Sequence, residues 1–332
     1  MRAACLSLIA AAALVAGTAA CGDPGVPGVP GGGRPGTTVP SASPPAVHPP
    51  GPATAARPTT TATPRPSATA PAGPVPAAPA ASLPHPDHVV VVVMENRSFD
   101  DIIGSSRAPY INELARGGAL FTQSYAVTHP SQPNYLALFS GSRQGVTSDS
   151  CPHTFSTANL GRSLVAAGRS FAGYSEGLPA VGSLVCENGA YARKHAPWVN
   201  FPSVPRSANV PFSAFPGSYA ALPRLSFVIP DLDHDMHDGT VAEGDQWLRS
   251  HLGGYATWAA SHNSLLVLTW DEDDRSESNR VVTVIAGAHV RPGPYAERID
   301  HYRLLSTLEG LERVPRVGRS ISAAPVTSIW TP

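Results

Sequence analysis

The stretch His88-Val89-Val90-Val91-Val92-Val93-Met94-Glu95-Asn96 decides the fold of this chain. Its five consecutive valines are β-branched, and no polar side chain interrupts them. Such a run predicts a strand buried on both faces, which is typical of a parallel sheet covered by helices on both sides. The sequence turns polar at Glu95 and Asn96, where this strand is expected to end.

The same pattern continues along the chain on the C-terminal side of this strand. We expect further strands over residues 119–125, 170–174, 225–229, 264–270 and 280–286. We expect helices over residues 110–116, 133–139, 160–167, 245–262 and 301–311, the fourth of them interrupted near Gly253-Gly254. Strands that alternate with helices indicate an α/β fold with a mostly parallel central sheet and helices on both of its faces.

Polar residues follow three of these strands directly. Glu95-Asn96 follows the first strand, Asp231 and Asp233 follow the strand at 225–229, and Asp271-Glu272 follows the strand at 264–270. The carboxyl ends of parallel strands meet at one edge of a sheet, so the three clusters predict a metal site there. An oxygen-rich ligand set favours Mg²⁺, Ca²⁺ or Mn²⁺ over Zn²⁺. The alternative for each acid is a helix cap or an exposed surface charge.

Ser131 is the candidate nucleophile, within the segment His129-Pro130-Ser131-Gln132-Pro133-Asn134. A serine just ahead of a helix that starts at a proline lies where backbone N–H groups and the helix dipole attract an anion. Its hydroxyl needs a base or a metal to become reactive. The alternative is a serine that only caps the helix.

Three histidines are candidates for contact with a substrate. His237 lies in the segment 231–238, which is dense in acids and imidazoles, and is our first choice for holding phosphate or protonating a leaving oxygen. His301 begins the last predicted helix, and His129 lies close to Ser131 in sequence. The alternatives are an exposed polar loop for His237 and an ordinary first-turn residue for His301.

The first 85 residues lack the pattern of a fold. Residues 1–20 combine Arg2, a short apolar run and small residues before Cys21, which predicts an export signal followed by a lipid-anchored cysteine. An ordinary cleaved signal and a secreted protein remain the alternative. Residues 21–85 are rich in Pro, Ala and Thr and are expected to form a disordered spacer to a membrane surface. Residues 86–332 are long enough for one α/β domain.

Net charge and cysteine content limit the partners and the compartment of the chain. The formal net charge is −1, and the sequence has no basic cluster, which argues against a nucleic-acid partner recognised by charge. Cys151 and Cys186 are the two cysteines of the predicted domain. In an oxidising compartment they are expected to form a disulfide, the alternative being two buried thiols.

Several motifs resemble those of one known family. The segment 94–100 resembles the opening signature of the bacterial phosphoesterase family, which includes acid phosphatases and phospholipases C within the alkaline phosphatase superfamily. Residues 111–125, the Ser131-to-Asn134 turn, the 270–272 segment and residues 287–309 are similar to further family segments in the same order. The resemblance implies an alkaline phosphatase-like fold and a hydrolase of phosphate esters.

By this resemblance, Ser131 would attack phosphorus. The metal would be held by Glu95, Asn96, Ser131, Asp271 and Glu272, and Asn134 would lie near the substrate. Residues 273–277 depart from the glycine-rich stretch ending in Asp-His that many members have, which makes phosphate monoesters the expected substrates and a phospholipase C or another phosphodiesterase the alternative. A non-catalytic surface lipoprotein that binds a phosphorylated ligand is the alternative from a different class.

Overall fold

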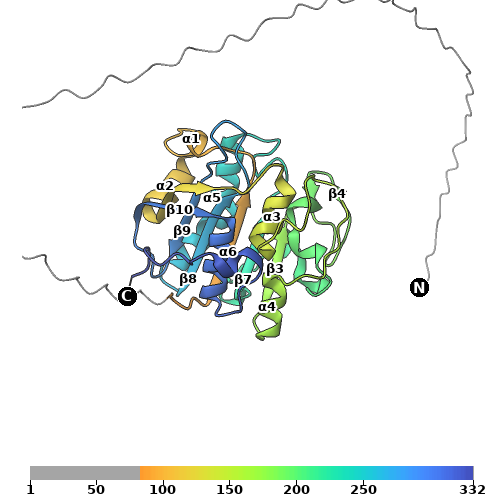
Figure 1. Cartoon of the computed structure of the whole chain (residues 1–332). Coiled ribbons are helices and arrows are strands. Elements are labelled where there is room, and N and C mark those ends of the chain that lie inside the picture. The colour runs from red at the N-terminus through yellow and green to blue at the C-terminus, as the bar shows by residue number, and fades with distance from the viewer. Residues whose placement is uncertain (1–82, 332) are drawn as a thin grey trace, which may run out of the picture. The chain divides into compact units, whose positions relative to one another are not determined.

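Figure 1 shows the computed structural model of the chain, which describes residues 83–331. Its largest element is an eight-stranded sheet in the order β10-β2-β9-β8-β1-β7-β3-β6. The strands are β1 His88–Met94, β2 Ala119–Tyr125, β3 Phe171–Ser175, β6 Asn209–Pro211, β7 Leu225–Ile229, β8 Ser264–Trp270, β9 Thr283–Gly287 and β10 Gly293–Asp300. Only β9 runs antiparallel to its neighbours in this sheet, so the prediction of a mostly parallel sheet is confirmed.

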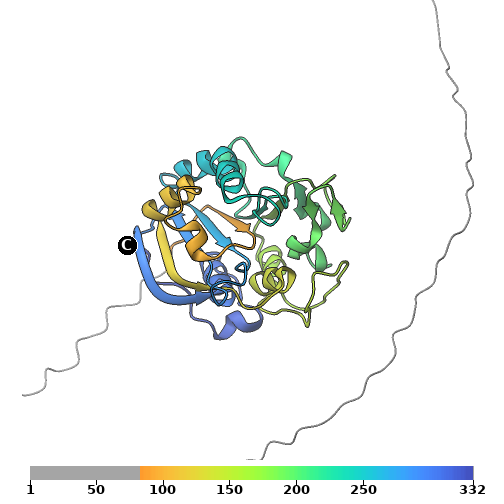
Figure 2. The same cartoon turned by 90° about the horizontal axis from the view of Figure 1, so that it is seen from above.

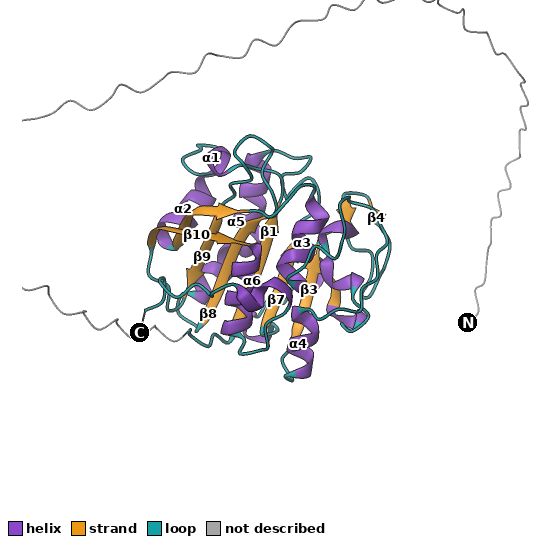
Figure 3. Cartoon of the chain, in the orientation of Figure 1, coloured by secondary structure: helices purple, strands orange, loops and turns teal. Residues whose placement is uncertain are grey.

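Helices cover both faces of the sheet, as Figures 2 and 3 show. Alternate residues of β1 enter two separate cores. Val89, Val91 and Val93 pack with side chains of α3, α4 and α6, whereas Val90, Val92 and Met94 pack with side chains of α1, α2 and α5. The helices are α1 Phe99–Ile102, α2 Pro109–Gly117, α3 Ser131–Ser140, α4 Leu160–Ala166, α5 Val241–Ala259 and α6 His301–Leu311. The valine run is therefore buried on both faces, as the sequence predicted.

Helix α5 corrects one prediction. It runs without a break through Gly253 and Gly254, where we expected an interruption. A Cβ atom at Gly254 would lie 2.5 Å from the hydroxyl oxygen of Tyr219. The absence of a side chain at this position therefore allows Tyr219 to pack closely against the helix, and the glycine does not end it.

A long insert between β3 and β7 lies beside the carboxyl edge of the sheet. It contains strand β6 and the hairpin of β4 Glu187–Asn188 and β5 Tyr191–Ala192. Its short helices are η1 Arg193–His195, η2 Pro197–Asn200, η3 Arg206–Ala208, η4 Phe212–Ala214 and η5 Tyr219–Ala221. A further short helix, η6 Gly318–Ser322, lies outside the insert, near the C-terminus. The expected disulfide between Cys151 and Cys186 is present, with the two Cα atoms 5.9 Å apart. It connects the hairpin to the loop that follows α3.

The N-terminal predictions concern residues that the structure does not describe. The predicted signal segment, Cys21 and residues 21–82 of the predicted spacer all lie outside the described residues. Within residues 83–331, we find no helix with both the length and the hydrophobicity that a bilayer span requires.

Candidate active site

The carboxyl ends of β1 and β8 bring two of the predicted ligands together. The two strands are parallel neighbours with Met94 opposite Trp270, so Glu95 and Asp271 emerge side by side. The amide of Asp271 donates to the carbonyl of Met94 (3.0 Å). Asn96 has a left-handed backbone (φ 48°), and its side-chain Nδ2 donates to Glu95 Oε2 (2.8 Å). Its backbone N–H donates to Asp271 Oδ1 (3.3 Å), so Asn96 contacts both acids.

Ser131 contacts the same pair of strand ends. Its Oγ donates to Glu95 Oε2 over 2.9 Å, and the residue is buried. We expected the helix to begin at Pro133, with Ser131 just ahead of it, but α3 begins at Ser131 itself, with Pro130 as its N-cap residue. Ser131 therefore lies in the first turn of a ten-residue helix, where the helix dipole favours a negative charge. In this turn Pro133 has no N–H, and the N–H of Gln132 donates to Asp149.

Two more of the predicted residues, Asn134 and His129, lie around Glu272. Its Oε2 accepts a hydrogen bond from Asn134 Nδ2 (3.1 Å) and lies 3.0 Å from His129 Nδ1. The other ring nitrogen of His129 lies 3.2 Å from Asp273 Oδ1. Asp273 itself is buried and accepts backbone hydrogen bonds from the turn at residues 275–279, which departs from the family pattern.

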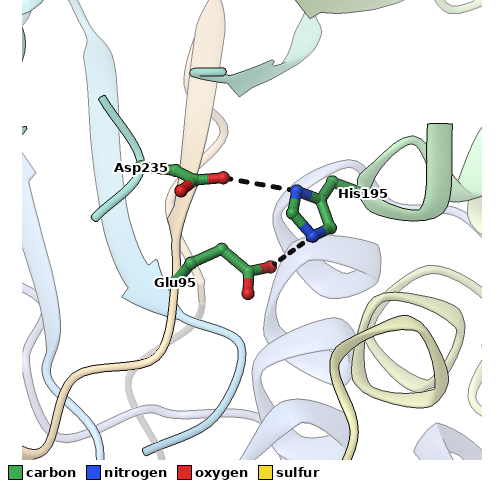
Figure 4. A group of neighbouring side chains, drawn as sticks. All are labelled: Glu95, His195 and Asp235. Carbon is green, nitrogen blue, oxygen red and sulfur yellow. Dashed lines mark ion pairs between the residues drawn. The ribbon is translucent and has the colours of Figure 1, made fainter. Parts of the chain in front are cut away.

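Two residues that we did not select from the sequence lie beside Glu95. Figure 4 shows the imidazole of His195 between two carboxylates, Glu95 and Asp235. His195 Nε2 lies 3.0 Å from Glu95 Oε1, and His195 Nδ1 lies 3.3 Å from Asp235 Oδ2. All three side chains are buried, and the ring of His195 stacks on Tyr135 with centroids 5.0 Å apart.

In this group, His195 bridges Glu95 and Asp235, and the three residues do not suit a separate metal site. Their possible ligand atoms lie within 4.8 Å of one another. However, Glu95 and Asp235 face opposite nitrogens of one ring, and a single cation cannot lie in front of both nitrogens. The arrangement instead matches that of a histidine holding a metal-binding carboxylate in place. The backbone N–H of Glu95 also donates to the carbonyl of Asp235 (2.8 Å), which ties the two segments together.

The site contains carboxylate oxygens that the described residues leave without hydrogen bonds. Glu95 Oε1, Asp235 Oδ2 and Asp271 Oδ2 are buried and have no hydrogen-bond partner among the described residues. Glu95 Oε1 lies 3.0 Å from His195 Nε2, but this contact lacks the geometry of a hydrogen bond. Buried, unpaired carboxylate oxygens are unfavourable unless a cation neutralises them. The oxygens of Glu95, Asn96, Ser131 and Asp271 therefore fit a hard divalent cation.

Burial shifts the pKa values of these groups toward their uncharged forms. Burial and the nearby Glu95 and Glu272 raise the pKa of Asp271 well above its usual value. Burial raises the pKa of Glu95, and burial together with Asp149 raises the pKa of Glu272 to about 7. Burial lowers the pKa of His195 to about 4, so its ring supplies little positive charge at neutral pH.

His237 lies at the open side of the site, beside a lysine that we also did not select. The backbone N–H of His237 donates to Asp235 Oδ1 (2.8 Å), and its Nδ1 lies 2.7 Å from Asp238 Oδ1. Its Nε2 is 3.5 Å from Lys194 Nζ. Burial opposes the charge of Lys194, but the carboxylates of Glu95 and Asp149 outweigh it and raise the pKa of the ammonium group.

His301 contacts the backbone at the end of β8. It is buried, and its Nε2 donates to the backbone carbonyl of Asp271 over 2.6 Å. This contact fixes the position at which β8 presents the Asp271 carboxylate. A role for His301 in binding substrate stays a prediction.

Lys194 and His195 were missed for one reason, and Asp235 for another. Lys194 and His195 lie in η1, inside the insert and far from any strand that the sequence predicts. The strand-end rule therefore could not select them. Asp235 lies in the acidic segment from which we chose only His237. A basic triplet, Arg193-Lys194-His195, directly before Ala196-Pro197 was the available signal.

Comparisons with known proteins agree with this geometry. The profile of the phosphoesterase family matches residues 105–315. A protein of Mycobacterium tuberculosis named phosphatidylinositol-3-phosphatase is 56% identical over 253 residues, which cover 75% of this chain and 85% of that protein. An acid phosphatase of Aspergillus fumigatus is 29% identical, and the match covers 72% of this chain but only 57% of that enzyme. In fold, the chain is similar to a protein in the alkaline phosphatase superfamily from Vibrio parahaemolyticus, with a TM-score of 0.52 and 14% identity over 74% of this chain and 72% of that one.

Proposed function

The chain belongs to the phosphoesterase family and is a phosphoric ester hydrolase, and from that premise we propose that it hydrolyses phosphate monoesters through Ser131 with a bound divalent cation. One observation carries this proposal. The hydroxyl of Ser131 donates to Glu95 over 2.9 Å, directly beside buried carboxylate oxygens that have no hydrogen-bond partner among residues 83–331. A potential nucleophile and a potential cation site thus share one carboxylate.

The residues that would hold the cation come from two strand ends and one helix start. A bound cation would neutralise charge on the phosphate oxygens and lower the pKa of a hydroxyl beside it. The oxygen donors favour Mg²⁺, Ca²⁺ or Mn²⁺. The proposed ligands are Glu95, Asn96, Ser131, Asp271 and Glu272.

The chain's own groups then perform a two-step transfer. Ser131 Oγ gives its proton to Glu95, which accepts its hydrogen bond in the resting chain, and attacks phosphorus, while the dipole of α3 attracts the phosphate oxygens at the helix start. The bond between phosphorus and the alcohol oxygen breaks, and His237 gives that oxygen a proton. Water then attacks the phosphoserine and gives a proton to His237, the bond between phosphorus and Oγ breaks, and Glu95 returns its proton to Oγ, which releases phosphate and restores the hydroxyl of Ser131. Glu95 accepts the hydrogen bond of that hydroxyl in the resting chain, and Asn96 and His195 contact Glu95 on its other sides.

The nucleophile is tested by removing the hydroxyl. In the Ser131→Ala variant we expect turnover of p-nitrophenyl phosphate to fall at least about 10³-fold with the thermal midpoint unchanged. Acid quenching of the parent enzyme during turnover should trap phosphate on Ser131, as peptide mass spectrometry would detect. Near-parent rates in the variant would remove Ser131 from the mechanism.

The choice of monoesters rests on the names of the relatives. Two of them are named an acid phosphatase and a phosphatidylinositol-3-phosphatase, which adds phosphoinositides to the substrates that should be tried. Turnover of a monoester, a bis-ester and phosphatidylcholine should be compared with and without a chelator. Preference for the bis-ester or for phosphatidylcholine would replace the proposal with a diesterase or a phospholipase C. Binding without turnover of any ester would favour the non-catalytic ligand-binding protein.

We further propose that the enzyme works outside the cytoplasm, held to a membrane by a lipid on Cys21 or released after cleavage of residues 1–20. The disulfide between Cys151 and Cys186 supports an oxidising compartment. Residues 21–85 would separate the catalytic domain at 86–332 from the membrane. Mass spectrometry of the mature N-terminus tests this proposal. A Cys21→Ala variant should be found in the medium, and its retention on cells would contradict the lipid anchor.

A further inference from the structure

A cavity of about 360 Å³ lies next to the proposed active site, and the mechanism above does not use it. Its lining includes Asp149, Glu187, Lys194 and His237, together with the Cys151–Cys186 disulfide. A volume at the low end of the usual range for ligand pockets suits a compact ligand. We call it the disulfide-side cavity.

The disulfide-side cavity adjoins the groups that would act on the ester. Asp149 Oδ1 accepts a hydrogen bond from the backbone N–H of Gln132, the residue after Ser131, over 2.9 Å. Lys194 precedes His195, whose ring lies 3.0 Å from Glu95. An ester whose phosphate lies at Ser131 therefore has this cavity beside it for its alcohol part.

Charge sets the chemistry of the cavity walls. Lys194 Nζ forms an ion pair with Asp149 Oδ2 at 3.2 Å, and His237 Nδ1 lies 2.7 Å from Asp238. Glu187 forms no ion pair with any described residue. The wall is thus negative overall once the Lys194–Asp149 pair is counted as neutral. Carboxylates accept and an ammonium group donates hydrogen bonds, so these walls suit hydroxyl groups.

The disulfide holds the two acids of the cavity in place. Cys151 lies two residues after Asp149, and Cys186 directly precedes Glu187. The bond thereby fixes acids from two distant segments on the walls of one small cavity. Such fixed negative charge repels an anionic group that enters the cavity with the alcohol.

We propose that the disulfide-side cavity is the alcohol subsite, that it takes a compact hydroxylated alcohol such as a sugar or cyclitol, and that Glu187 selects against an alcohol with a second phosphate next to the ester. This inference rests on the proposed function, because it assigns the alcohol of the same ester. Glu187 acts on specificity and takes no part in bond cleavage.

The test compares two esters in the same enzyme. We would measure kcat/KM for a cyclitol monophosphate and for the bisphosphate with the second phosphate on the adjacent ring carbon. In the Glu187→Lys variant we expect the preference for the monophosphate to fall about 3- to 10-fold, through the KM of the bisphosphate with kcat unchanged. The matched control is Glu113→Lys, which makes the same charge change at an exposed position of α2.

Binding measurements separate this inference from the proposed function. The Ser131→Ala variant, titrated calorimetrically with the same two esters, should bind the monophosphate more tightly, and adding Glu187→Lys should narrow that difference. If the parent hydrolyses neither ester but this difference is present, the cavity assignment holds and the proposed function fails. An equal shift in Glu187→Lys and Glu113→Lys, or no shift in either, would overturn the cavity assignment.

Discussion

The buried carboxylates of this protein fall into two groups that differ in their partners. Asp245 and Glu309 are buried, and both oxygens of each accept hydrogen bonds. Asp245 accepts from the backbone N–H groups of Tyr110 and Ile111 at the start of α2 (3.1 and 2.8 Å). Glu309 accepts from the N–H of Val317 (2.9 Å) and from the hydroxyl of Ser320 (2.5 Å). These two acids hold elements of the fold together.

The second group is at the carboxyl edge of the sheet. Glu95, Asp235 and Asp271 are equally buried, yet each has one oxygen with no hydrogen-bond partner within the described part of the chain. Burial alone therefore does not distinguish an acid that stabilises the fold from an acid that binds a ligand. Glu312 also has one unpaired oxygen, but this acid lies beside Arg169 and Arg224, which neutralise its charge. Among the described residues, the unpaired oxygens of the second group have no such cation beside them and lie next to Ser131, which distinguishes them.

The largest effect should follow from Asp271→Asn. This variant keeps the shape of the side chain but removes a charge that the cation would need. We expect kcat/KM to fall at least about 10³-fold, or about 4 kcal/mol in transition-state stabilisation. Cation content, measured by elemental analysis, should fall as well. The metal-free variant should be at least as resistant to urea as the metal-free parent, because a buried repulsive charge is gone.

An Asp271→Asn variant that is clearly destabilised without metal would place Asp271 in the first group, with Asp245 and Glu309. Unchanged cation content would remove it from the ligands. The Asp87→Asn variant serves as the control, since Asp87 is exposed, lies directly before the other end of β1 and is not a proposed ligand.

The next effect concerns the bridge through His195. In the His195→Gln variant, Glu95 loses the imidazole that lies 3.0 Å away, and Asp235 loses the other side of the same ring. Loss of such a supporting contact typically weakens cation binding about 10- to 100-fold. Calorimetric titration of the chelator-treated protein with Mn²⁺ measures this directly and does not depend on turnover. His262→Gln, at an exposed position beyond α5, is the matched control, and equal affinities in both variants would contradict the bridge.

The sequence predicts the site residues at the strand ends better than those that the insert between β3 and β7 contributes. The valine run, the polar residues after it and Asp271-Glu272 after β8 follow from alternating burial and strand ends, which are local properties of the chain. They correctly indicated that Glu95, Asn96 and Asp271 would lie together. These residues are fixed by a register, Met94 opposite Trp270, that buried parallel strands enforce. Ser131, which we chose from the start of a helix and from the family resemblance, contacts this group through Glu95.

His195 and Lys194 escaped prediction because no local pattern places them. They lie on a short 3-10 helix of an insert whose position depends on the disulfide and on packing of the insert against α3, as in the stacking of His195 on Tyr135. The same limit applies to α5. Two adjacent glycines predicted a break in this helix. Gly254 instead leaves room for Tyr219, which lies more than thirty residues earlier in the chain, so the local sequence could not show its purpose.

Asp245→Asn should lower the stability of the protein and leave its activity nearly unchanged, which is the reverse of what we expect for Asp271→Asn. The Asp245 carboxylate accepts hydrogen bonds from two backbone N–H groups, and in the variant the amide nitrogen of asparagine would face one of these donors. Leaving a buried donor without an acceptor costs about 1–3 kcal/mol, so urea unfolding should show a loss of about 2 kcal/mol. The catalytic rate constant of the folded enzyme should stay within about twofold of the parent value. A loss of activity greater than the loss of folded protein would mean that the start of α2 matters to the site.

A change in pH dependence, which leaves activity aside, is expected at Glu309. Burial raises the pKa of this carboxyl to about 7, above its ordinary value in the unfolded chain. The folded state therefore keeps a proton that the unfolded state releases, and stability declines by up to roughly 1 kcal/mol per pH unit as pH rises from about 4.5 to 7. The Glu309→Gln substitution would mimic the protonated acid, since the amide carbonyl can accept from Val317 and the amide nitrogen can donate to Ser320. Urea unfolding in chelator across this range should show that the variant matches the parent at the acidic end and exceeds it at about pH 8. If the two curves stay parallel, the hydrogen bonds to Val317 and Ser320 favour the ionised carboxylate enough to offset its burial, and Glu309 is a paired charge in the folded protein.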